Sequence, residues 1–143
     1  MDRKRLRSEL ARPGPLSLET REWFASSVIP LLALAERRIT EGEIERLEAL
    51  VATLPDYPPV RGPREFRTQF WQTIAEATRN PVVIENVKWW AGAMEEREQL
   101  TGDDSSGPER IIPKAKYLGL ILALRRGSGA PAFWTEVIEE LLY

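Results

Sequence analysis

The side chains able to do chemistry in this chain are carboxylates, lysines, arginines and tyrosines, because its 143 residues include neither histidine nor cysteine. That composition excludes Ser-His-Asp hydrolysis, thiolate nucleophiles and zinc sites built from histidine or cysteine. Two acidic runs, at 95–98 and 136–140, could supply paired carboxylates for acid–base catalysis. We interpret both runs as solvated helix faces rather than as catalytic pairs. No cofactor site is predicted.

Composition and charge indicate one domain without an electrostatic bias toward a partner. The chain is 43% hydrophobic and carries a formal net charge of -2. This suits a single buried core and gives no global field that would favour nucleic acid or a membrane surface. No apolar run approaches the about 20 residues that span a bilayer, and Met1 is followed by charged residues rather than by a signal core. We expect a cytoplasmic protein without membrane contact.

Six segments with helical periodicity must position any site. They follow a basic N-terminal arm, residues 1–16, for which a short helix or a frayed arm is expected and direct DNA binding is not. Residues 17–143 then form the predicted domain. The helices are expected at about 18–38, 40–54, 63–79, 80–99, 112–125 and 131–142. The fold class is therefore all-α, a single antiparallel bundle of about six helices that could enclose a central cavity.

Local signals mark several helix boundaries. Ser17 and Thr40 are good N-caps, Thr40 with Glu43 three residues later as a capping box. Asn80 should cap a helix that Pro81 begins. Pro30 should kink or split the first long helix because its ring removes a backbone donor. A polar loop is expected at 101–108.

In two of the expected helices, the apolar residues indicate which side faces the core. Phe66, Phe70, Ile74 and Ala77 recur at three- and four-residue spacing in helix 63–79. In helix 112–125 we expect the core face to be formed by the apolar residues Ala115, Leu118 and Leu122, with Gly119 and Ala123 allowing close approach to a neighbouring helix.

The order of these segments resembles a known family. Residues 66–81, FRTQFWQTIAEATRNP, are similar to the third-helix motif of the FCD domain, the effector-binding half of FadR-type GntR transcription regulators. Residues 32–38 and 118–132 resemble the opening and closing helices of the same domain, so the resemblance covers about Ser17 to Leu142. It implies a helical bundle with a central effector cavity and a symmetric homodimer.

The chain departs from this family at the metal site. FCD domains commonly bind a divalent metal through an aspartate and three histidines, and the resemblance places Arg67, Trp71, Tyr117 and Glu139 at those positions. Only Glu139 is a good metal ligand, so no metal is expected. The resemblance instead implies an organic effector, with Arg67, Trp71 and Tyr117 taking a carboxylate or an aromatic ring.

A second departure concerns DNA binding. GntR regulators carry a winged helix-turn-helix ahead of the FCD domain, whereas few residues precede Ser17 here. We therefore expect no operator binding of that kind, and either an excised ligand domain or a natural stand-alone copy, which Met1 favours.

Five tryptophans could pack in the core, line a cavity or contact a partner. Trp90 is added to the candidate ligand contacts. Its neighbour Trp89 points about 100° away on a helix, so the two cannot share one narrow core stripe, and one of them could lie at an interface.

Three functions remain open. The first is a sensor or dimerisation module that binds a small organic ligand, carboxylate-bearing or aromatic, in a metal-free cavity. The second is a biosynthetic enzyme of cyclase or isomerase type that uses the cavity for positioning, with Tyr117, Arg67 or Glu139 as the polar group. The third is an interaction module whose tryptophans pack without a cavity.

Overall fold

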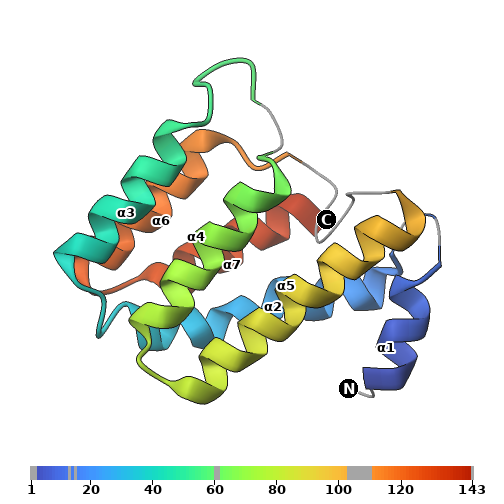
Figure 1. Ribbon diagram of the computed structural model, residues 1–143. Coiled ribbons are helices and arrows are strands. Elements are labelled where there is room, and N and C mark those ends of the chain that lie inside the picture. Colours follow the sequence, from blue (N-terminus) through green and yellow to red (C-terminus); the bar gives the residue numbers. More distant parts are fainter. Residues whose placement is uncertain (1–2, 13, 15, 60–61, 103–110, 143) are drawn as a thin grey trace.

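The computed structural model describes residues 3–12, 14, 16–59, 62–102 and 111–142, and within these ranges the chain is helical without any strand. The predicted all-α fold is confirmed (Figure 1). The helices are α1 Arg3–Leu10, α2 Leu18–Ala35, α3 Glu41–Ala52, α4 Arg64–Ala77, α5 Pro81–Thr101, α6 Lys114–Arg126 and α7 Ala130–Leu142. The helix beyond the six expected is α1, formed by the basic arm. The loop predicted at 101–108 lies mostly outside the described residues.

Capping groups start three of the helices as predicted. The side chains of Ser17, Thr40 and Asn80 accept hydrogen bonds from backbone N–H groups in the first turns of α2, α3 and α5. At Thr40 the box is complete, because Glu43 Oε1 accepts the Thr40 backbone N–H at 3.0 Å. Pro81 takes the first position of α5, where its missing N–H costs nothing.

Pro30 does not split α2, which is continuous from Leu18 to Ala35. The ring side of Pro30 is exposed, whereas Leu31, Leu32 and Ala35 in the next turn are buried. Tertiary packing of this turn against α4 and α7 therefore holds the helix together across the missing hydrogen bond.

The helices pack as a layered bundle around one main core. Helix α2 lies against α7 and α4, α3 against α4 and α6, and α6 against α7. The predicted stripe of α4 is confirmed, since Phe66, Phe70, Ile74 and Ala77 are all buried. Helix α1 is separate from this core and packs on α5 (Figure 1).

The expected core face of α6 is wrong. Leu118 and Leu122 are exposed to 45% and 56%, and the buried side carries Tyr117, Leu120 and Leu124 instead. Residues 117–124 of this helix are all apolar or glycine, so its own sequence does not show which side faces the core.

The close approach expected at Gly119 is confirmed. A Cβ atom added at Gly119 would lie 2.4 Å from Cζ of Phe133 on α7, well inside van der Waals contact. The glycine thus allows α6 and α7 to pack closely.

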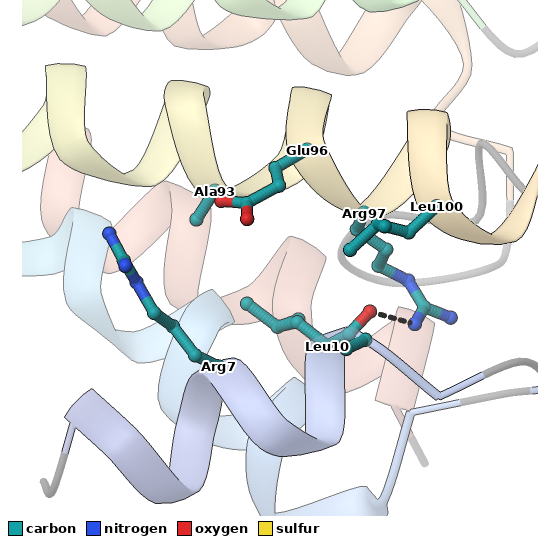
Figure 2. Close-up of a pocket in the computed structure, with 7 residues that line it drawn as sticks. Arg7, Leu10, Ala93, Glu96, Arg97 and Leu100 are labelled. Atoms are coloured by element: carbon teal, nitrogen blue, oxygen red, sulfur yellow. Dashed lines mark hydrogen bonds between the residues drawn. The ribbon is translucent and has the colours of Figure 1, made fainter.

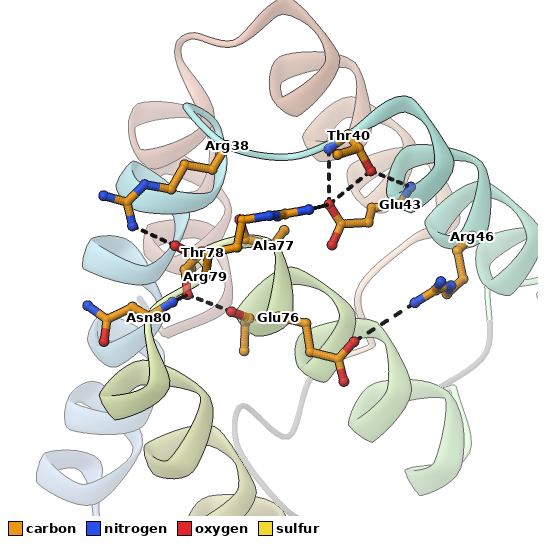
Figure 3. Close-up of polar contacts among 10 residues, drawn as sticks. Arg38, Thr40, Glu43, Arg46, Glu76, Ala77, Thr78, Arg79 and Asn80 are labelled. Carbon is orange, nitrogen blue, oxygen red and sulfur yellow. Dashed lines mark hydrogen bonds and ion pairs between the residues drawn. The ribbon is translucent and has the colours of Figure 1, made fainter.

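A polar joint sets the direction of α5 (Figure 3). Arg79, between α4 and α5, has a φ of 52°, in the left-handed region that non-glycine residues seldom adopt. Its guanidinium donates to Glu43 at 2.9 Å and to the Ala77 carbonyl at 2.7 Å. Arg38 donates to the carbonyl of the buried Thr78 at 2.6 Å. These bonds tie the turn between α4 and α5 to the start of α3.

We predict a pH-dependent loss of stability when Glu43 is replaced by alanine. Burial acts to raise the pKa of Glu43, but hydrogen bonds from Thr40 and Arg79 outweigh it and lower that pKa below the ordinary 4.5. Its contribution is therefore fully present above about pH 4.5 and is lost as the pH falls through the folded-state pKa. Glu43→Ala should lower the melting temperature by about 3–5 °C at pH 7, from a loss of about 1 kcal/mol.

The matched control is Glu45→Ala, which removes an exposed carboxylate from the same helix. Thermal melts followed by circular dichroism between pH 3 and 7 measure both variants. An equal loss in the control, or a Glu43 effect that grows with acidity, would contradict the assigned role of the joint.

Candidate functional site

A cavity of about 1120 Å³, open to solvent over a large part of its boundary, lies between α2, α4, α5 and α7, with Tyr117 of α6 and Arg3 of α1 also on its surface. It separates two hydrophobic clusters. The first half of α5 packs on the main core through Val83, Ile84 and Val87. The second half belongs to a smaller cluster formed by Leu6, Leu10, Leu16, Trp90, Ala93 and Met94. Helix α5 thus spans the cavity and is supported by different partners along its length.

Three helices present apolar side chains to the cavity. Helix α2 contributes Phe24, Val28 and Leu31, and α5 contributes Val87 and Met94. From α7 come Trp134, Ile138 and Leu141. Such mostly apolar walls with a few polar groups are typical of small-molecule sites.

The structure brings four of the five predicted site residues together. Arg67, Trp71, Trp90 and Tyr117 all line the cavity, although they come from three helices. Glu139 does not: it is exposed on α7 and lies outside the lining. The preceding residue, Ile138, faces the cavity, and adjacent helix positions point about 100° apart.

Aromatic rings form the wall beside α4. The Trp71 ring centroid lies 5.3 Å from that of Trp134, in an edge-to-face arrangement. Tyr117 is 4% exposed and packs edge-on against Phe70 with a centroid distance of 5.1 Å. These contacts fix the orientation of the rings that a ligand would meet.

A second aromatic group lies where α2, α5 and α1 meet. Ring centroids of Phe24 and Trp90 are 3.9 Å apart, and those of Trp23 and Trp90 are 4.6 Å apart. Trp90 is buried, and its indole Nε1 has no hydrogen-bond partner. Trp89 is half-buried, with the guanidinium carbon of Arg3 4.9 Å from its ring centroid. The rings of Trp89 and Trp90 nevertheless contact each other edge to face, with centroids 5.0 Å apart, and both line the cavity. Whether Trp89 contacts a partner chain stays a prediction.

Cations outnumber carboxylates on the described part of the lining, which includes Arg3, Arg64, Arg67 and Lys88 but only Glu85 as an acid. Arg67 is half-buried and its Nε donates to the Gly62 carbonyl at 3.2 Å, which holds the side chain against the start of α4. Arg64 pairs with Glu98 near the end of α5. Lys88 likewise pairs with Glu85, at 3.8 Å. With two of the four cations paired to carboxylates, the excess of positive charge on the lining is small, and it favours an anionic group.

Sequence reasoning did not select Phe24, Arg64 or Trp134 as ligand contacts. One signal was available for α4, since residues 64, 67, 68 and 71 recur at three- and four-residue spacing beside the Phe66 stripe. A half-polar stripe next to a core stripe indicates a helix side that faces neither packed core nor open solvent.

Among the described residues, no three or more aspartate, glutamate, histidine or cysteine side chains are grouped so as to hold a metal ion. Nor is any helix in that part of the chain long and apolar enough to cross a membrane. Comparisons with protein-family models, curated proteins and solved structures found no match to this chain.

Because of the cavity, we predict opposite outcomes when two different valines are replaced by phenylalanine. Val87→Phe should leave stability unchanged or raise it, because the larger ring extends into unfilled space beside α5. Val51→Phe should cost about 1–3 kcal/mol, because Val51 is fully buried in the packed core. Urea unfolding at constant m-value measures both. Equal destabilisation by the two variants would show that the space beside Val87 is filled.

Proposed function

We propose that this chain is an FCD-like helical domain that binds a small organic ligand in the cavity beneath α5 and acts as a sensor or dimerisation module. One observation carries the proposal: a cavity of about 1120 Å³ bounded by apolar and aromatic side chains. Typical ligand sites occupy about 300–1,000 Å³. The space therefore suits a drug-sized molecule or a long acyl chain.

The cavity is not a sign of loose packing throughout the protein. Leu32, Leu47, Phe70, Ile74 and Leu120 in the main core are each 0% exposed. A large space bordered by a tightly packed core supports a binding role, and it speaks against the interaction module that requires a filled core.

The charge of the lining supports a carboxylate-bearing ligand. Arg67 is the central candidate because it comes from α4 between Arg64 and Trp71, both of which also line the cavity. A guanidinium binds a carboxylate through charge-assisted, often bidentate hydrogen bonds. Trp71 and Tyr117 would pack against the apolar body of the same ligand.

The proposed FCD-like fold also predicts how ligand binding is transmitted to a partner chain. An FCD-like domain requires an all-helical fold, as found here, and the cap at Asn80-Pro81 belongs to the segment on which the resemblance rests. In such a domain, ligand binding shifts helix packing and a symmetric dimer passes the change to a partner chain. The ligand binds here without a metal, because the positions that resemble the metal ligands hold Arg67, Trp71, Tyr117 and Glu139.

We predict that the wild-type protein binds cis-parinaric acid, a fluorescent long-chain carboxylate, and that Arg67→Met weakens this binding about ten-fold or more. The reason is the loss of a charge-assisted hydrogen bond in an apolar site, about 1.5–3 kcal/mol. Fluorescence titration measures the affinity. The methyl ester of the same probe should bind wild type and Arg67→Met about equally, because it has no carboxylate.

Arg46→Met is the matched control, since Arg46 is an exposed arginine on α3 outside the cavity. It should bind the acid like the wild type. Absence of saturable binding to the wild type would reject the ligand-binding proposal, and equal weakening by both variants would reject the role of Arg67.

A further inference from the structure

Helix α1 forms part of the cavity wall without belonging to the main core. Its apolar residues Leu6 and Leu10 are 2% and 3% exposed and pack in one cluster with Trp90 and Met94. Both Trp90 and Met94 also line the cavity. On the same side, Arg3 of α1 lines the cavity directly and covers the ring of Trp89. Trp90 and Met94, which would contact a ligand on this side, are therefore also side chains on which α1 packs.

A buried arginine anchors the end of α1 to α5. Arg97 is 1% exposed, and its guanidinium donates to the carbonyls of Leu10, Arg12 and Gly14 at 2.9, 2.8 and 2.7 Å. Figure 2 shows Arg97 reaching from α5 to the last turn of α1. A cation at a helix C-terminus satisfies carbonyl groups that lack partners within the helix. This anchor fixes where α1 lies.

A carboxylate ties α1 to the start of α2. Glu9 accepts the backbone N–H of Ser17 at 3.0 Å and the hydroxyl of Thr20 at 2.6 Å. Burial acts to raise the pKa of Glu9, but the hydrogen bonds from Thr20 and Ser17, with the charge of Arg12, outweigh it and lower that pKa. The ionised carboxylate therefore holds the chain entering α2.

The docking of α1 is nevertheless separable from the rest of the fold. The helix has eight residues, shorter than the about 12–15 at which an isolated helix becomes even marginally stable in water. A gap of about 30 Å³ remains between α1 and α5, beside Leu10, Arg97 and Leu100 (Figure 2). The cluster beneath α1 also contains the unpartnered Nε1 of Trp90. A short helix on an incompletely packed surface can release while the main core stays folded.

From this arrangement we propose that α1 is a ligand-coupled cover: an occupied cavity stabilises α1 on α5, and release of α1 opens the side of the cavity formed by Trp90 and Met94. The inference rests on the ligand-binding function proposed above. Its physical basis is linkage, because a ligand that contacts Trp90 and Met94 in the arrangement held by α1 binds the docked state more tightly than the released one.

This coupling gives the proposed sensor a defined output. The guanidinium carbons of Arg3 and Arg7 lie 4.9 and 6.0 Å from the ring centroid of Trp89 when α1 is docked. Release of α1 removes both cations from that ring and exposes Leu6 and Leu10. Ligand binding thereby determines whether α1, a basic and amphipathic helix, is docked on α5 or released.

The first test needs no variant. Hydrogen exchange of the full-length wild type is followed by mass spectrometry with and without saturating cis-parinaric acid. The amides of residues 6–10 should exchange at least about ten-fold more slowly with the probe. Protection limited to α2, α4 and α5, with α1 unchanged, would overturn the coupling but leave the binding function intact.

The second test compares Leu6→Asp with Ser8→Asp, which places the same charge on the exposed side of α1. Stopped-flow fluorescence should show that Leu6→Asp releases cis-parinaric acid about ten-fold faster than the wild type, whereas Ser8→Asp does not. Unchanged release in Leu6→Asp, with fast exchange proving that α1 is undocked, would overturn the inference alone. Absence of probe binding to the wild type would overturn the proposed function and this inference together.

Discussion

Helix α5 depends on two separate sets of contacts, and the rest of the site follows from that division. Its first half packs on the main core through Val83 and Val87, and its second half packs through Trp90 and Met94 on a smaller cluster that includes α1. The two sets leave a cavity between α5 and α2. The polar joint at Arg79 sets the direction of α5, and the ion pair between Arg64 and Glu98 connects its end to the start of α4.

The helix boundaries could be predicted because they depend on neighbouring residues. Ser17, Thr40 and Asn80 act on backbone groups two or three positions away, so their effect is readable without knowledge of the tertiary fold. The effect of Pro30 was predicted less well, because it depends on packing between helices rather than on neighbouring residues. Its local cost is real, but packing of Leu31 and Leu32 against other helices keeps α2 continuous.

The buried face of α6 was not readable from the sequence. Leu118 and Leu122 are as apolar as Leu120 and Leu124, and only the positions of α3 and α7 decide which pair is covered. The cavity is equally a property of the assembly. No single helix encodes it, because its walls come from residues of α2, α4, α5 and α7 that each look like ordinary core or surface positions.

Most of the candidate site residues lie on one cavity, although no helix alone indicates that cavity. Arg67, Trp71 and Tyr117 were selected through the family resemblance, and Trp90 through the excess of tryptophans. All four line one space, whereas Glu139 missed it by one helix position. A difference of one helix position turns a side chain by about 100°, which is enough to place the Glu139 carboxylate in solvent.

The binding proposal and the coupling of α1 share the same side chains. A ligand beneath α5 would contact Trp90 and Met94, which also pack in one cluster with Leu6 and Leu10 of α1. A ligand in the cavity and the docking of α1 on α5 therefore stabilise each other. The main core, which includes no residue of α1 and has Leu47 and Phe70 fully buried, would remain folded in either state.

The most direct test of the central claim is native mass spectrometry of the protein purified from its own host, with chemical identification of any molecule released on denaturation. The account predicts a stoichiometric organic adduct with an apolar body, a carboxylate and no metal. A protein that carries no small molecule, or one that carries a divalent metal ion, would contradict it.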